Sequence, residues 1–252
     1  MAQASPPTAI ADLRRYLERS VGCEPAAGTL PFGQPAIDVE TPGGGLALGH
    51  VHEISEGGFA AEYAGLAAIF AAGILARVSG PVLWCLRGRD LFAPALSRVG
   101  LSADRVIFCE TWKDRDVLPA MEEGLHTRGL AAVVGELTKL SLTASRRLQL
   151  AAGASGVTGL IIRRWRNANE REDSEAPSAS STRWRVSPSP SPNTGFDGLY
   201  RQHWHLELLR ARGGEPHSWI VEACDAAGSI RHVSTVGDRS PAADGQNRAL
   251  AG

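Results

Sequence analysis

The chain has 252 residues, a formal net charge of −1 and a pI near 6.7. This balance provides no overall electrostatic attraction to nucleic acid or to a membrane surface. The hydrophobic content of 43% is enough for the core of one large α/β domain. The start of the chain lacks a signal-peptide pattern, and its most apolar stretch is uncharged only over residues 63–76, short of the ~20 residues of a membrane span. With four widely spaced cysteines, the expected compartment is a reducing cytoplasm.

The N-terminal residues predict one amphipathic helix followed by an irregular segment. Ile10, Leu13, Leu17 and Val21 recur at helical spacing. Residues 28–41 are too rich in Pro and Gly for a regular element.

Residues 41–78 have the layout of a phosphate-binding unit. Glycines lead into an alternating strand at residues 50–55, which is followed by a glycine turn and a long apolar helix. In a working phosphate loop, G-x-x-x-x-G-K-[ST], bare backbone N–H groups, a lysine and a hydroxyl hold the phosphates and Mg²⁺. Neither possible starting point of this motif retains the lysine and the hydroxyl. The degenerate loop comprises Glu56, Gly57, Gly58, Ala61, Glu62 and Tyr63.

The charge of Glu62 is decisive for nucleotide binding. A lysine about 4 Å from a phosphate attracts it by about 1 kcal/mol in water and about 4 kcal/mol at an effective dielectric of 20, whereas a glutamate repels it by a similar amount. We therefore expect no nucleotide, no other cofactor and no catalytic residue. An ordinary strand–turn–helix with an exposed Glu62 remains the alternative interpretation.

Farther along the chain, apolar strands alternate with helices. The expected strands are residues 81–86, 105–110, 130–134 and 157–162, and the expected helices lie near residues 91–99, 114–129 and 143–152. Asp90 is expected to cap the first of these helices, and Ser141 or Thr143 the last. Apolar strands separated by helices predict an α/β fold whose mostly parallel sheet is covered on both faces.

The last third of the chain has a different composition. Residues 167–181 are charged and polar, which predicts a mobile loop, and a Ser/Pro-rich run follows a short strand at residues 183–186. Residues 204–210 and 217–222 predict an antiparallel hairpin. The expected parts of the chain are an N-terminal helix and extension (1–29), one domain (30–223) with mobile loops over 167–198, and a flexible tail (224–252).

Several segments together resemble the ImuA family of damage-inducible mutagenesis proteins. They are LPFGQPAID, PGGGLALG, PVLWC, AAVVGEL, LTASRRLQLAA with SGVTGL, and RGGEPHSWIVE, within residues 28–223. The run PGGGLALGHVHEIS and the order of the elements are also similar to the core of bacterial RecA recombinases. The number and order of these pieces carry the resemblance.

The resemblance implies a RecA-like fold without recombinase or ATPase activity. It also implies a cytoplasmic protein that joins the nucleoid after DNA damage and acts in SOS-linked mutagenesis. The implied partners are RecA, the Y-family polymerase relative ImuB and, indirectly, an error-prone replicative-type polymerase. Two other functions stay open: a divergent phosphate-loop NTPase of DNA repair, and a regulator similar to the SulA cell-division inhibitors.

Two further positions of the nucleotide machinery are altered. A RecA-like enzyme carries an acid at the tip of an apolar strand, where this chain has Gly135 followed by Glu136. Because side chains alternate along a strand, the shift points Glu136 to the other face, and we interpret it as a solvated loop acid. The general-base position offers only Asp90, which we assign to a helix cap.

A basic and aromatic patch predicts weak DNA contact around the mobile loop. Its arginines can neutralise phosphates and its tryptophan can stack on bases, although nearby acids nearly cancel the charge. The candidate residues are Arg163, Arg164, Arg166, Arg183, Trp184 and Arg185. A solvated loop flanked by strand ends is the alternative.

The hairpin adds candidates for a partner interface. Trp204 and Trp219 are natural anchors at an interface, but packing against the core is the commoner explanation of their alternating pattern. His203, His205 and His217 lack an acid or cysteine at ligand spacing. We expect surface histidines and no metal.

Overall fold

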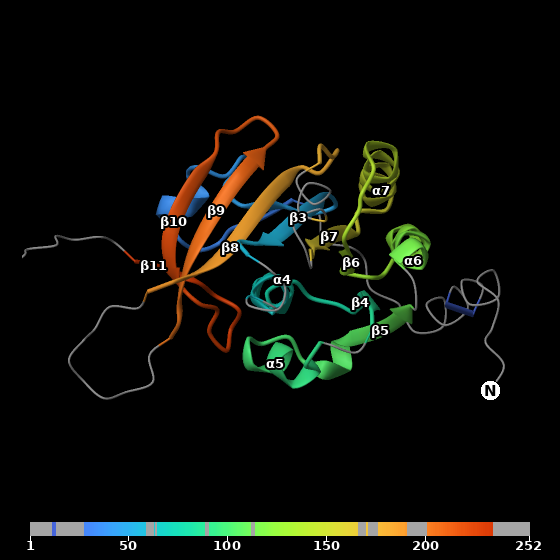
Figure 1. The fold of residues 1–252 in the computed structure, drawn as a ribbon, viewed down its shortest axis with the longest axis horizontal. Coiled ribbons are helices and arrows are strands. Elements are labelled where there is room, and N and C mark those ends of the chain that lie inside the picture. Colours follow the sequence, from blue (N-terminus) through green and yellow to red (C-terminus); the bar gives the residue numbers. More distant parts are fainter. Residues whose placement is uncertain are drawn as a thin grey trace, which may run out of the picture.

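A nine-stranded mixed sheet with helices on both faces forms the protein in the computed structural model (Figure 1). The structure describes residues 12–13, 28–58, 63, 65–88, 91–111, 114–165, 170, 176–190 and 201–233. Within these ranges the strand order is β11-β10-β9-β8-β3-β7-β6-β4-β5. The α/β prediction is confirmed.

Six neighbouring strands run parallel and form the centre of the sheet. They are β3 (Val51–Glu56), β4 (Val82–Arg87), β5 (Val106–Thr111), β6 (Ala132–Leu137), β7 (Thr158–Arg163) and β8 (Thr182–Ser189). Every residue of β6 and β7 is buried, as continuous apolar runs predict for strands covered on both faces. All predicted strands lie within three residues of the observed ends, and the largest differences are at the carboxyl ends of β6 and β8, which continue to Leu137 and Ser189.

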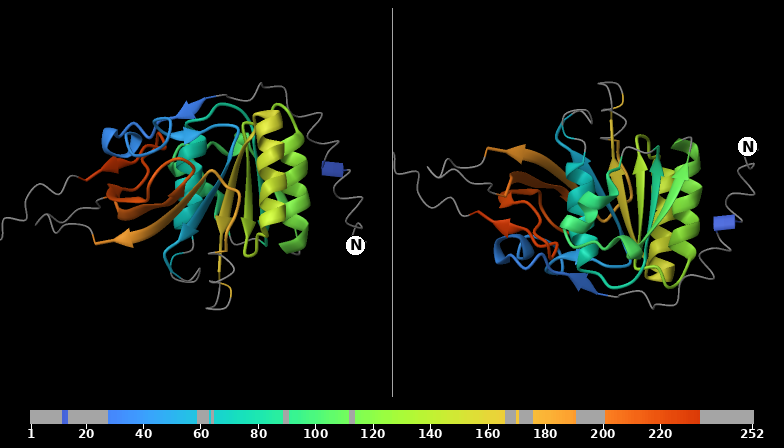
Figure 2. Two further views of the ribbon diagram at one scale, coloured as in Figure 1. Left: turned by 90° about the horizontal axis from the view of Figure 1, so that it is seen from above. Right: turned by 90° about the horizontal axis from the view of Figure 1, so that it is seen from below.

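The helices divide into two layers (Figure 2). Helices α4 (Leu66–Ala76) and α5 (Ala93–Arg98) pack on one face with the even-numbered residues of β6 and β7. Helices α6 (Asp114–His126) and α7 (Leu142–Ser155) pack on the other face with their odd-numbered residues. Ser141 caps α7 by accepting a hydrogen bond of 3.1 Å from the Ala144 amide, whereas α5 has Phe92 and not Asp90 at its N-cap position.

An antiparallel hairpin extends the sheet beyond β8. It consists of β9 (His203–Ala211) and β10 (His217–Glu222), as predicted. Its tryptophans join Phe32, Phe70 and Trp184 in an aromatic cluster whose neighbouring ring centroids are 5.2 to 6.4 Å apart. This cluster lies under α4 and holds the hairpin against the parallel part of the sheet.

The Pro- and Gly-rich segment before β3 is more regular than predicted. It contains a two-stranded sheet of β1 (Thr29–Leu30) and β2 (Leu46–Ala47), and the short helix α2 (Pro35–Asp38). Asp38 organises the turn before α2, because its carboxylate accepts hydrogen bonds from the amides of Phe32, Gly33 and Gln34. A short 3₁₀ helix, η1 (Ala103–Arg105), precedes β5.

The ordered domain extends past the predicted boundary at residue 224. Ile230 lies in the core, and β11 (Arg231–His232) pairs with β10. Residues 176–181, which were predicted to end a mobile loop, include the buried Ser178, Ser180 and Ser181. The predicted N-terminal helix lies outside the described residues apart from Asp12 and Leu13, as does the predicted tail beyond residue 233.

Among the described residues, no helix combines the length and apolar character needed to cross a membrane. The parallel core, the helices on both faces and the terminal hairpin together match the predicted RecA-like architecture.

Replacement of Gly228 by alanine tests the packing of the segment after β10. A Cβ at Gly228 would lie 2.3 Å from the Gly73 carbonyl oxygen of α4, whereas a Cβ at Gly213 would meet no atom within 4 Å. Both glycines have a positive φ, so each alanine carries a backbone cost of roughly 1–2 kcal/mol. We expect Gly228→Ala to lose about 1–3 kcal/mol more than Gly213→Ala in urea unfolding, because it also overpacks the core. Equal losses would contradict this packing.

Candidate functional site

The turn after β3 occupies the place of a phosphate loop, and its beginning is closely packed. The Gly57 amide donates a hydrogen bond of 3.1 Å to the Val186 carbonyl, and a Cβ at Gly58 would lie 1.8 Å from the Tyr63 ring. Ala61 and Glu62 of the degenerate loop lie outside the described residues. The charge argument for Glu62 therefore stays a prediction.

The carboxylate of Glu56 lies at the N-terminus of α4. Its Oε1 accepts a hydrogen bond of 3.2 Å from the Gly65 amide, and the Ala67 amide donates a further hydrogen bond to the carboxylate. Bare N–H groups at a helix N-terminus are where α/β proteins bind phosphate, because the amides and the helix dipole both favour an anion. In this protein a side chain of the chain itself supplies that anion.

Burial changes the protonation of this group. Only 3% of Glu56 is exposed. Desolvation raises the pKa of Glu56 to about 7, and the negative charge of Glu136 acts in the same direction. The positive charge of Arg164 and the two helix amides oppose this change because they favour the ionised carboxylate. Glu56 therefore titrates near neutral pH while it remains in contact with the helix amides.

Glu136 is a buried strand residue and not the solvated loop acid that we predicted. Strand β6 continues to Leu137, so Glu136 lies inside the sheet. Its Oε1 accepts a hydrogen bond of 2.9 Å from the Trp84 indole, and its Oε2 lies 3.1 Å from an Arg164 guanidinium nitrogen. At the neighbouring Gly135 a Cβ would lie 1.9 Å from the Met121 sulfur, so close packing of α6 favours glycine where a RecA-like enzyme has its acid.

Glu56, Arg164 and Glu136 together form an internal charge cluster at the carboxyl ends of β3, β7 and β6. Open α/β sheets bind their ligands at this edge. Here the cluster holds two acids for one arginine, and both acids contact groups of the protein. A polyphosphate entering at these strand ends would meet helix amides that already donate hydrogen bonds to Glu56.

A second buried charge cluster lies on the opposite face of the sheet. Glu53 of β3 has its Oε2 3.2 Å from an Arg183 nitrogen and 3.8 Å from an Arg163 nitrogen. Its Oε1 accepts hydrogen bonds from the hydroxyls of Ser178 and Ser180. One carboxylate thus contacts three segments: the end of β7, the start of β8 and the segment that precedes β8.

The predicted DNA patch is wrong for its most central members. Arg163 is 1% exposed and contacts Glu53, and Trp184 is 0% exposed within the aromatic cluster. The others do not form one surface with them: Arg183 contacts Glu53, Arg164 contacts Glu136, and Arg185 lies 3.8 Å from Glu207. Arg166 lies outside the described residues. These side chains divide between two faces of the sheet because neighbouring strand residues point in opposite directions.

The two hairpin tryptophans are core residues and not partner anchors. Trp204 is 2% exposed and Trp219 is 8% exposed, and the Trp219 indole donates a hydrogen bond of 2.9 Å to the Ala36 carbonyl. His203 is buried as well, contrary to its assignment to the surface. In the described part of the chain, no three His, Cys, Asp or Glu side chains are grouped to hold a metal ion.

His52 forms a buried link that the sequence did not reveal. Its Nε2 lies 2.7 Å from the Ala47 carbonyl, which can only accept, so Nε2 carries the proton. Its Nδ1 then accepts from the Thr182 hydroxyl at 2.7 Å. Burial lowers the pKa of His52 to about 4, so the ring is neutral at physiological pH and joins β2 to β3 and β8.

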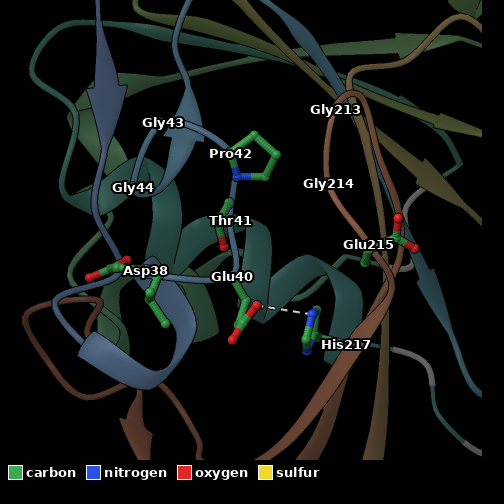
Figure 3. Close-up of a pocket in the computed structure, with 11 residues that line it drawn as sticks. Asp38, Glu40, Thr41, Pro42, Gly43, Gly44, Gly213, Gly214, Glu215 and His217 are labelled. Atoms are coloured by element: carbon green, nitrogen blue, oxygen red, sulfur yellow. Dashed lines mark ion pairs between the residues drawn. The ribbon is translucent and has the colours of Figure 1, made fainter.

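A polar pocket lies at the other end of the strands, near the amino ends of the parallel strands (Figure 3). It has a volume of about 440 Å³ between the segment 38–44 and the β9–β10 turn. Glu40 and His217 face each other across it with 3.0 Å between their side chains. Its carboxylates and glycine turns offer no cationic cradle for a phosphate.

The Glu56→Gln variant tests the raised pKa through the pH dependence of stability. The folded pKa of about 7 exceeds the ordinary value of 4.5, so the wild-type protein loses stability from Glu56 as the pH rises through this window. Glutamine removes that loss. We expect the free energy of unfolding of the variant, relative to wild type, to rise between pH 5 and pH 8 by up to about 3 kcal/mol. Parallel curves for both proteins would contradict this, and the exposed Glu215→Gln controls for the loss of one charge.

Glu53→Gln tests the second cluster. It leaves the buried Arg163 and the partly exposed Arg183 without their carboxylate, and breaking a buried pair costs about 3–5 kcal/mol. Glu207→Gln breaks the more exposed pair with Arg185, so we expect it to cost less than about 1 kcal/mol in the same urea titration. A small loss for Glu53→Gln would show that the carboxylate is not needed in the fold.

Comparison with known proteins identifies the family of this chain. No family model matches it. Two curated relatives do: Protein ImuA of Caulobacter vibrioides strain NA1000/CB15N and Protein ImuA of Caulobacter vibrioides strain ATCC 19089/CB 15. Each is 38% identical over 225 residues, which cover 85% of this chain and 92% of the relative. The chain therefore belongs to the ImuA family of damage-inducible mutagenesis proteins.

Proposed function

We propose that this protein is a non-catalytic RecA-like adaptor in SOS-induced, error-prone translesion DNA synthesis. In this role it binds ImuB, RecA or both, and so brings the mutagenic polymerase to lesions on the nucleoid. The observation that carries the proposal is the Glu56 carboxylate at the N-terminus of α4, because it fills the anion position that an ATPase needs. Family membership supports the damage-response setting.

The energetic argument against nucleotide hydrolysis rests on displacement. A triphosphate would have to remove Glu56 from the Gly65 and Ala67 amides and would then lie near two buried acids, Glu56 and Glu136, whose ionised forms repel phosphate. Like charges about 4 Å apart repel by about 4 kcal/mol at an effective dielectric of 20. The chain also offers no lysine at the position that offsets phosphate charge in a working loop.

Nucleotide binding and turnover test the non-catalytic part. We expect the melting temperature of the purified protein to stay unchanged with millimolar ATP and Mg²⁺, and phosphate release to equal that of a buffer blank. A RecA preparation serves as the positive control. Nucleotide-dependent stabilisation that disappears in Gly57→Val or Gly58→Val would overturn this part and favour the divergent NTPase.

Co-expression tests the adaptor part separately. A tagged copy of this protein should retain ImuB or RecA of the same organism through a salt wash, while a tagged unrelated RecA-like protein retains neither. Retention of neither partner would refute the adaptor role whatever the nucleotide assay gives. Filamentation of undamaged cells on overexpression, without retention of either partner, would favour a SulA-like regulator.

A further inference from the structure

Two cysteines lie side by side in the sheet. Cys85 of β4 and Cys109 of β5 are direct Cα partners in the parallel pairing of these strands. Adjacent strands are about 4.8 Å apart, which falls within the Cα separations of about 4.4–6.8 Å that a disulfide bridges. Both side chains belong to the face covered by α6 and α7. The fold therefore places the two cysteine side chains next to each other.

The two thiols differ in exposure and in acidity. Cys85 is fully buried, whereas Cys109 is partly exposed on β5, the last strand in the described order of the sheet. The thiol of Cys85 donates a hydrogen bond to Cys109, which lowers the pKa of the Cys109 thiol although burial opposes this change. The same hydrogen bond, together with burial, raises the pKa of the Cys85 thiol. An accessible, more acidic thiol beside a second thiol is the arrangement of a peroxide-reactive cysteine and its resolving partner.

We propose that Cys85 and Cys109 form an oxidation site for hydroperoxides, with Cys109 as the reacting thiol and Cys85 as the resolving thiol. The Cys109 thiol gives up its proton and attacks one peroxide oxygen, and the O–O bond breaks. Cys109 becomes a sulfenic acid, and the second oxygen takes up that proton and leaves as water or an alcohol. The Cys85 sulfur then attacks the Cys109 sulfur, the S–O bond breaks, and the Cys85 proton leaves with the hydroxide as water. The two sulfur atoms supply the two electrons that reduce the peroxide.

The geometry also indicates that this disulfide is readily reversible. Side chains of directly paired residues in parallel strands point the same way, so their Cβ atoms do not converge as in a relaxed disulfide. Strained disulfides are reduced more easily. Cys224 is also partly exposed but provides a contrast in acidity, because desolvation raises the pKa of its thiol to about 12. The site does not depend on the proposed adaptor role.

Mass spectrometry of the full-length protein tests the proposal. The native protein is treated with a small excess of hydrogen peroxide, quenched, alkylated under denaturing conditions and digested. We expect a peptide pair joined through Cys85 and Cys109, with the loss of two hydrogen atoms, and its disappearance after treatment with dithiothreitol. The same treatment of urea-unfolded protein should give no preference for this pair.

Single variants separate the two roles. In Cys85→Ala, Cys109 should stop at a sulfenic acid that dimedone traps, and in Cys109→Ala, Cys85 should remain largely unmodified because it is buried. Cys224→Ala should form the disulfide as the wild type does. Matching circular dichroism spectra and melting temperatures confirm that the variants are folded. Pairing of Cys109 with Cys23, or oxidation of Cys109 in the wild type without its joining Cys85, would overturn the proposal.

Discussion

The hydrogen bonds between the Glu56 carboxylate and the first amides of α4 determine what the N-terminus of this helix can bind. The helix begins with N–H groups that need an acceptor, and its dipole favours negative charge there. In an ATPase of this architecture a phosphate supplies both. Here β3 ends in a glutamate that reaches back to the Gly65 amide, so the helix end is stabilised in the absence of any ligand. The helix end that binds phosphate in such an ATPase thus contacts a side chain of this protein.

The same strand holds two buried groups whose protonation equilibria oppose each other. Desolvation of Glu56 favours its protonated form, with a pKa raised to about 7, and desolvation of His52 favours its neutral form, with a pKa lowered to about 4. As the pH rises from 4 to 7, the contribution of Glu56 to the free energy of unfolding falls and the contribution of His52 rises. Their contributions largely cancel across this range. Replacing one of the two residues therefore exposes the pH dependence of stability that the other contributes.

The sequence predicted the framework well, and it failed where side chains from distant segments meet. The apolar runs of β6 and β7 are local signals that predicted strands correctly, and of the two caps that the sequence offered for α7, Ser141 and Thr143, the structure has Ser141. Glu53 reads as an ordinary polar residue of an alternating strand, and its partners Ser178 and Arg183 are more than a hundred residues away. Glu136 was assigned to a loop for the same reason, since the indole that contacts it comes from β4 and the guanidinium comes from the residue after β7. Repulsion of phosphate was assigned to Glu62 alone, whereas the structure also places Glu56 at the helix amides.

The basic and aromatic residues around β7 and β8 show why composition is a poor guide to a nucleic-acid surface. Arginine and tryptophan side by side in sequence suit phosphates and bases. In a strand, however, neighbouring residues face opposite sides of the sheet, so Arg183 reaches the Glu53 cluster while Trp184 enters the aromatic cluster beside Phe32. Each side chain is thereby committed to the interior on its own face. The same alternation puts Cys85 and Cys109 on one face, because directly paired residues of parallel strands share their orientation. The register of the strands therefore decides which side chains lie together and which are separated, and local composition does not encode that register.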